Sequence, residues 1–124
     1  MDDILSHQKI HQVGADIGPA GRPHDTTVYF IRPELTQILN VYGRLVAAGE
    51  WRDYAIDHLK GQAVFSVFRR ASEMPHYRII KEPALANQQG AWKILGANGQ
   101  TLKRGKQLDQ LLRYFDRLML KAVT

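Results

Sequence analysis

The stretch FSVFRRASEMPHYRII, residues 65–80, decides the fold. Its two halves are rich in aromatic and β-branched residues, and the turn-forming segment ASEMP (71–75) separates them, so we predict two strands of one hairpin. The first strand, AVFSVFRR (63–70), is apolar on both faces. Because such a strand needs cover above and below, we place it in the centre of a sheet with a helix on each face.

Further strands flank this hairpin. WRDYAIDHL (51–59) alternates loosely and leads into it through the turn KGQ. AWKILGA (91–97) and QTLKRG (100–105) enclose Asn98–Gly99, the strongest short hairpin signal. TTVYFIR (26–32) is a short β-rich run that we predict as a strand. Strands joined by short turns usually pair as neighbours, which favours one antiparallel sheet of about five strands.

Two helices complete the predicted fold. The first starts at Pro33, which fits a first helical turn, and stops at Gly49. The second covers residues 106–120 and places one apolar face toward the core: Leu108, Leu111, Leu112, Phe115, Leu118 and Met119. The order is strand, helix, antiparallel meander, helix, and the predicted fold class is α+β.

Residues 1–25 are predicted to be a flexible tail, and residues 26–124 a single α+β domain. The segment GADIGPAGRPHD (14–25) has three glycines, two prolines and no periodic apolar face that could offset the entropy of ordering. His7 and His11 have a spacing that suits a metal on a helix. No third ligand is placed to complete the set, so we predict no metal site.

The composition removes several function classes. The chain has no cysteine, which excludes disulfides, thiolate metal sites and cysteine nucleophiles. No segment approaches the roughly 20 apolar residues of a membrane span. The N-terminus opens with two aspartates and has no continuous apolar run, unlike a secretory signal. We therefore expect a cytoplasmic protein that does not bind membranes.

The net charge of +5 is unevenly distributed. Residues 1–24 and 25–60 each carry −1, whereas residues 61–124 have eleven bases against four acids and carry +7. Such a division favours an anionic partner of the C-terminal half, either nucleic acid or a phosphorylated molecule. The alternative is that the surplus charge only aids solubility.

Catalytic motifs are missing from the sequence, which has no P-loop, nucleophile elbow, dinucleotide fingerprint or zinc-protease motif. The best acid–base cluster is Asp53, Asp57 and His58, but on a strand the two aspartates share one face and the histidine points to the other. We expect His58 to be a hydrogen-bonded, half-buried ring. No catalytic residue and no cofactor are predicted.

The predicted site is basic and consists of Arg69, Arg70, His76, Arg78, Lys103 and Arg104. Guanidinium groups suit phosphate oxygens because they can donate two parallel hydrogen bonds, so we predict that this set binds an anion. The alternative is a solvated face on which the arginine stems lie over apolar neighbours.

Two kinds of anion fit this set. A single-stranded nucleic acid needs aromatic side chains for stacking, and Tyr77 and Trp92 are the candidates. A compact phosphoryl group needs two or three arginines around one point, which Arg69 or Arg70 could supply together with Arg78. Nucleic acid is favoured, because net positive charge suits a polyanion more generally than a single phosphate.

The chain contains three sequence segments that we compare with known families: LTQILNVYGRLVAAGEWRDYAIDH, VFSVFRRASEMPHYRI and LKRG. In this respect the chain resembles a family of short bacterial proteins known only as a domain of unknown function, over about residues 27–120. The resemblance implies a small stand-alone cytosolic protein and supplies no activity.

The order helix, antiparallel sheet, helix is also similar to that of Src-homology-two domains. FSVFRRASE resembles the phosphate-binding strand of that family, HYRI its later basic strand and LDQLLRYFD its final helix. The resemblance implies a phosphate-binding role for Arg69. YAIDHL occupies the first sheet position after the helix and lacks an arginine, which moves FSVFRR to the second position.

The function predicted from the sequence is that of a small non-enzymatic binding or regulatory protein that engages an anionic macromolecule, nucleic acid or a phosphorylated protein. The first alternative is a protein-interaction module, either a homodimer built on the exposed edge around Asn98–Gly99 or a phosphopeptide binder. The second is a small enzyme with a pocket near His58 or His76.

Overall fold

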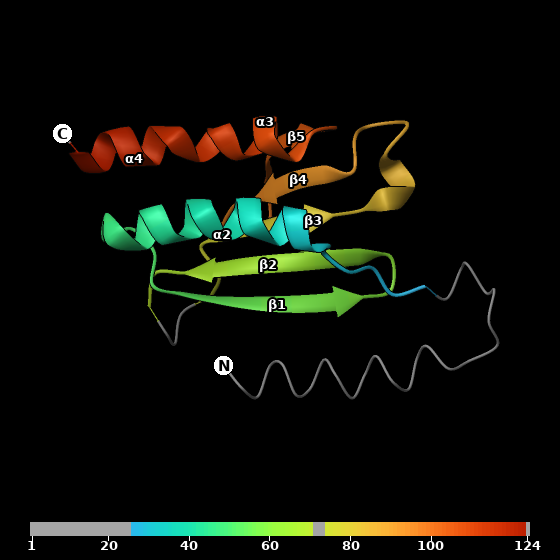
Figure 1. The fold of residues 1–124 in the computed structure, drawn as a ribbon, viewed down its shortest axis with the longest axis horizontal. Coiled ribbons are helices and arrows are strands. Elements are labelled where there is room, and N and C mark those ends of the chain that lie inside the picture. The colour runs from blue at the N-terminus through green and yellow to red at the C-terminus, as the bar shows by residue number, and fades with distance from the viewer. Residues whose placement is uncertain (1–25, 71–73, 124) are drawn as a thin grey trace.

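The computed structural model describes residues 26–70 and 74–123. The predicted tail, residues 1–25, lies outside the described residues. The described chain folds into the elements shown in Figure 1. In chain order these are α2 (Arg32–Ala47), β1 (Asp53–Leu59), β2 (Gln62–Phe68), β3 (Tyr77–Lys81), the short 3₁₀ helix η2 (Pro83–Leu85), β4 (Trp92–Leu95), β5 (Thr101–Gly105), α3 (Leu108–Leu112), the 3₁₀ turn η3 (Arg113–Phe115) and α4 (Asp116–Val123).

The five strands form one antiparallel sheet in the order β1-β2-β3-β4-β5, so each strand pairs with its neighbour in sequence. The predicted α+β class is confirmed, and the 63–70 strand is an interior strand next to the 76–81 strand, although the exact centre of the sheet is β3. The hairpin between β4 and β5 turns through residues 96–100, where the Gly96 N–H donates to the Gln100 carbonyl at 2.9 Å. None of the described helices has the length and apolarity of a membrane span.

Helix α2 begins and ends where its sequence signals lie. The side chain of Glu34 accepts a hydrogen bond from the Ile31 N–H at 2.9 Å, which satisfies a donor at the start of the helix. Gly49 follows the last turn with φ +81°, a conformation that costs other residues more, and its N–H donates to the Val46 carbonyl. The buried stripe of the helix is Ile38, Val41 and Leu45.

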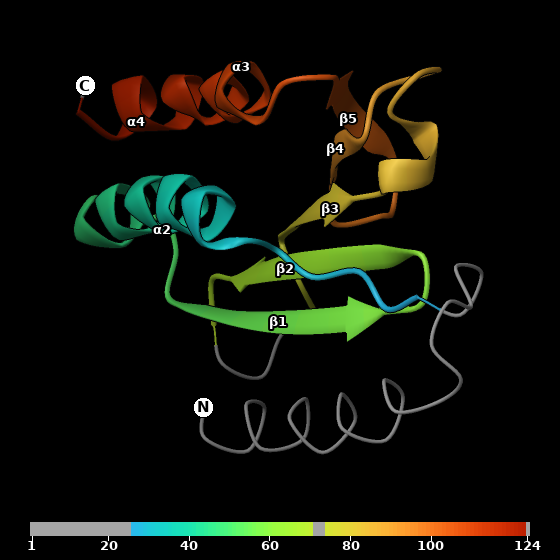
Figure 2. The same ribbon diagram turned by 45° about the vertical axis from the view of Figure 1, so that its right-hand side comes forward.

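Both long helical segments lie on the same side of the sheet (Figures 1 and 2). The prediction of a helix on each face is therefore wrong. Five strands about 4.8 Å apart make a sheet about 20 Å wide, whereas a helix with its side chains is about 10 Å across. Two helices side by side are thus needed to cover one face, and α2 packs directly against α3 and α4.

We call the helix-covered side of the sheet the front face. Its central residues Phe65, Ile79 and Ile94 are fully buried in the main core. The other side, the back face, is set by strand alternation and register. Its central positions on β2 to β5 are occupied by Val64, Ser66, Arg78, Ile80, Lys93 and Arg104.

The predicted strand 26–32 is also wrong. Thr27 forms a single bridge with Lys60, and the Val28 N–H donates to the Leu59 carbonyl at 2.9 Å, but no ladder follows. Beyond these contacts the chain leaves the sheet edge, and α2 starts at Arg32. Two side chains take the place of the strand ladder here. The Lys81 Nζ donates a hydrogen bond to the Tyr29 carbonyl, and the Glu34 carboxylate accepts one from the Ile31 N–H.

The last helix is predicted as one element over 106–120, but it is divided into α3, η3 and α4. The tighter 3₁₀ turn carries Phe115, which is fully buried. Its ring lies edge-on to Trp51 at 4.9 Å and to Tyr77 at 5.1 Å between ring centroids. Phe115 therefore anchors the C-terminal helices to the front face.

We predict that Phe115→Ala lowers the free energy of unfolding by about 3–5 kcal/mol, because it leaves a cavity among aromatic rings that cannot close over it. Urea denaturation measures this loss. Met74→Ala, at a side chain that is 73% exposed, is the control and should stay within about 0.5 kcal/mol. A loss below about 1 kcal/mol for the Phe115 variant would contradict the packing described above.

Candidate anion-binding surface

Three of the six predicted site residues lie where β2 leads into β3. Arg69 and Arg70 directly follow the end of β2 and are exposed. His76 directly precedes β3 and is half-buried. Its N–H donates to the Val67 carbonyl at 2.8 Å, and its ring lies edge-on to Tyr77 with centroids 4.6 Å apart.

The other three predicted residues lie on strands. Arg78 on β3 is opposite Ser66, and Arg104 on β5 is opposite Lys93, so both belong to the back face. Lys103 is opposite Ile94 and therefore belongs to the front-face side of the edge strand. The fold thus brings Arg78 and Arg104 to one surface and directs Lys103 away from it.

Lys93 lies between these two arginines on the back face but is not among the six predicted residues. It is directly opposite Arg104 on one side and Ile80 on the other. The alternation of AWKILGA already places Lys93 on the side of the strand away from Trp92. The register with β5, which puts Lys93 opposite Arg104, is the further information needed to group it with the predicted basic residues.

Of the three bases on the back face, one is neutralised by an ion pair within the described residues. Lys93 forms an ion pair with Glu82 at 3.1 Å. Arg104 is half-buried, and its Nη1 atom is buried without a hydrogen-bond partner. Like charges directly opposite one another on paired strands destabilise a sheet, and the Glu82 carboxylate offsets this repulsion on the Lys93 side of the pair Lys93–Arg104. Strand spacing and rise put the Cα atoms of Arg78 and Arg104 about 12 Å apart.

The two stacking candidates lie elsewhere, and their predicted role is wrong. Trp92 is only 6% exposed and stacks on Phe30 within the core. Tyr77 packs from the front face against Trp51 and Phe115. Both residues precede a basic residue of the back face by one position, and one step along a strand reverses the direction of the side chain.

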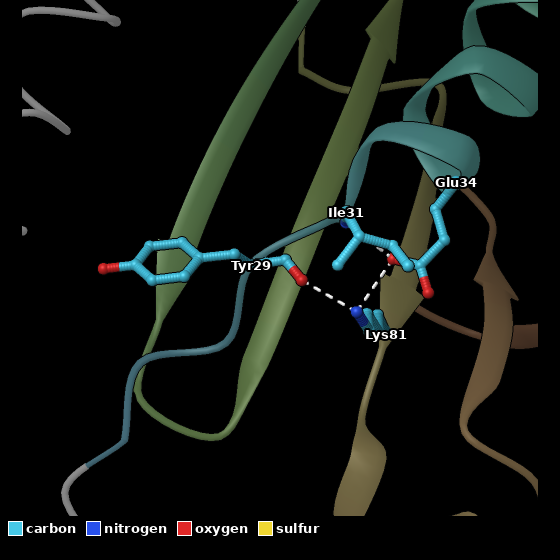
Figure 3. A network of polar contacts seen from close by, with 4 residues as sticks. All are labelled: Tyr29, Ile31, Glu34 and Lys81. Atoms are coloured by element: carbon cyan, nitrogen blue, oxygen red, sulfur yellow. Dashed lines mark hydrogen bonds and ion pairs between the residues drawn. The ribbon is translucent and has the colours of Figure 1, made fainter.

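A polar network lies on the front face where α2 begins (Figure 3). The Lys81 Nζ donates to the Tyr29 carbonyl at 2.7 Å and to Glu34 Oε1 at 2.8 Å. The same carboxylate oxygen accepts from the Ile31 N–H. The side chains of Lys81 and Glu34 are only 15% and 18% exposed, so this network fastens the start of α2 to β3.

His58 lies in the same front-face row, opposite Ala63. Its ring is half-buried and lies edge-on to Tyr29, with centroids 4.9 Å apart. Both ring nitrogens are buried without a hydrogen-bond partner, so the expected hydrogen-bonded ring is wrong in that respect. Burial lowers the pKa of His58, Asp57 raises it, and Lys81 lowers it again. A neutral imidazole thus fits this position better than a charged one.

Within residues 26–70 and 74–123, no group of three histidine, aspartate or glutamate side chains could hold a metal. The pair His7 and His11 lies outside the described residues. Asp53 and Asp57 pair with back-face residues of β2, on the side of the sheet away from His58.

The fold defines a small α+β domain in which a five-stranded antiparallel meander is covered on one face by helices. The chain belongs to the family described as "Protein of unknown function (DUF2794)", whose model matches residues 28–112. Among curated proteins and among solved structures, no chain matches it significantly.

We predict that Lys81→Met lowers the free energy of unfolding by about 1–3 kcal/mol, because it leaves a partly buried carboxylate and a carbonyl without their donor. Lys106→Met, at an exposed position, is the matched control and should stay within about 0.5 kcal/mol. Equal stability of the two variants would contradict a fastening role for Lys81.

The lowered pKa of His58 predicts that stability falls on acidification. The unfolded chain takes up a proton on this residue near the ordinary pKa of about 6.5, and the folded protein does so only at lower pH. The contribution of His58 is therefore fully present above pH 6.5 and is lost as pH falls from there to the folded pKa. Urea denaturation across this range should give a shallower pH dependence for His58→Leu. The same slope in the wild type and in His58→Leu would contradict the assignment.

Proposed function

We propose that this domain is a non-enzymatic binding module for an anionic macromolecule, and that its ligand is the phosphate backbone of nucleic acid. The observation that carries the proposal is the buried Nη1 of Arg104, which has no hydrogen-bond partner on a face that also bears Arg78 and Lys93.

An anion would remove two costs of the unliganded back face. A buried guanidinium N–H without an acceptor costs about 1–3 kcal/mol, and a phosphate oxygen would supply that acceptor once the atoms that cover Nη1 move aside. The same anion would screen Arg104 from Lys93, which lies directly opposite it and is paired with Glu82.

The spread of the cations favours an extended anion. Arg78, Lys93 and Arg104 occupy three adjacent strands, and Arg69 and Arg70 continue the positive charge beyond the end of β2. Because Tyr77 and Trp92 are packed into the core, base stacking does not contribute. Contacts to phosphates alone give binding with little dependence on base sequence.

We predict that the protein binds a fluorescent DNA duplex of mixed sequence with an affinity that falls steeply with salt. The log–log slope should be about −0.9 for each phosphate neutralised. The double variant Arg78→Glu with Arg104→Glu should weaken binding at least about tenfold and make the slope shallower. Fluorescence anisotropy at several salt concentrations measures both quantities.

The matched control is Arg32→Glu with Arg117→Glu, which changes the net charge equally at exposed positions of the helices. Control protein that binds like wild type supports a specific role of the back face. Equal weakening by both double variants, or an affinity that does not respond to salt, would overturn the proposal.

A further inference from the structure

A groove lies between α2 and the C-terminal helices, on the side of the molecule away from the back face. Its volume is about 320 Å³, at the small end of ligand pockets. The two helical segments lie side by side and run in the same direction (Figures 1 and 2). Val41 and Leu112, both buried, lie at the base of the groove where the helices meet the core.

The walls of this groove are mostly polar, and five of the lining residues are exposed: Asn40, Arg44, Asp109, Arg113 and Asp116. On α2 the lining residues are Gln37, Asn40, Val41 and Arg44, and on the C-terminal segment they are Asp109, Leu112, Arg113 and Asp116. Both sets follow the spacing i, i+3, i+4, i+7, so each set lies along one side of its helical segment. One residue of each set, Val41 on α2 and Leu112 on α3, is apolar and buried, and the other six carry polar or charged side chains.

The charges in the groove do not neutralise one another. Arg113 is four residues after Asp109 and three before Asp116, distances at which ion pairs form on a helix. Within the described part of the chain, neither these three residues nor Arg44 form an ion pair. Because the helices are parallel, Arg44 and Asp116 occupy the same end of the groove, and Asp109 occupies the other.

We propose that this groove binds a small zwitterion of the free amino acid class. Arg113 and Arg44 are placed to receive its carboxylate, which matches guanidinium geometry in two parallel hydrogen bonds. The ammonium group, carried on the same carbon as the carboxylate, is received by the carboxylates that flank Arg113 on its own helical segment, Asp109 and Asp116. The amides of Gln37 and Asn40 supply further donors and acceptors, and the apolar base accommodates an aliphatic side chain.

A zwitterion suits this groove better than a simple ion. A lone anion at Arg113 would also face the carboxylates of Asp109 and Asp116, and a lone cation would face two guanidinium groups. A ligand with both charges satisfies both kinds of side chain at once. This site is separate from the proposed nucleic-acid surface, which lies on the other side of the sheet.

The test is a titration of the isotope-labelled full chain with each standard L-amino acid in turn, followed through its backbone amide NMR signals. We expect saturable shifts for residues of α2 and of the C-terminal helices with at least one amino acid. Arg113→Gln and Asp109→Asn should each weaken this binding by about tenfold, which corresponds to about 1.4 kcal/mol. Arg117→Gln is the matched control, because Arg117 lies over the Tyr114 ring and does not line the groove.

Acetate and methylammonium, which each carry one of the two charges, should leave these signals unshifted at the same concentration. Equal shifts with either ion, no saturable shift with any amino acid, or unchanged binding by both groove variants would each overturn the proposal. If Arg113→Gln alters the circular dichroism spectrum, Arg44→Gln on the opposite wall replaces it. None of these variants touches the back face, so failure here is independent of the DNA experiment.

Discussion

The arrangement of this domain depends on one partly buried ammonium group. Lys81 lies on the front face in a row with His58 and Trp92, where an unpaired charge would be costly. Its partners are the Tyr29 carbonyl and the Glu34 carboxylate, both from the segment that leads into α2. Satisfying Lys81 therefore fixes the point at which the chain leaves the sheet edge, and with it the start and position of the helix.

Once the position of α2 is fixed, the width of the sheet determines where the C-terminal helices pack. One helix covers about half of five strands, so the C-terminal helices lie beside it and seal the front face with Phe115. The two candidate sites are consequences of this layering. The seam between the helices contains the groove, and the face that neither helix covers carries Arg78, Lys93 and Arg104.

The local elements could be predicted from the sequence, because their signals are local. Pro33 and Gly49 bracket α2, and Asn98–Gly99 lies in the last hairpin. The predictions that are wrong concern features that depend on contacts between residues distant in the sequence. The apolar residues on both sides of strand 63–70 indicate that both faces are buried, but they do not show which face the helices occupy. TTVYFIR has the composition of a strand, and the sequence does not show that Lys81 binds the Tyr29 carbonyl within it. For the site, alternation already separates Tyr77 from Arg78, whereas the position of Lys93 opposite Arg104 requires the register.

The region that defines the family ends at residue 112, three positions before Phe115. The aromatic cluster of Trp51, Tyr77 and Phe115 therefore straddles that limit. A protein trimmed to residues 28–112 would contain every strand yet lack the ring that closes its hydrophobic layer. Such a fragment would expose to water the aromatic surface of Trp51 and Tyr77 that Phe115 contacts, so the stretch recognised by sequence comparison is shorter than the hydrophobic layer that covers the sheet.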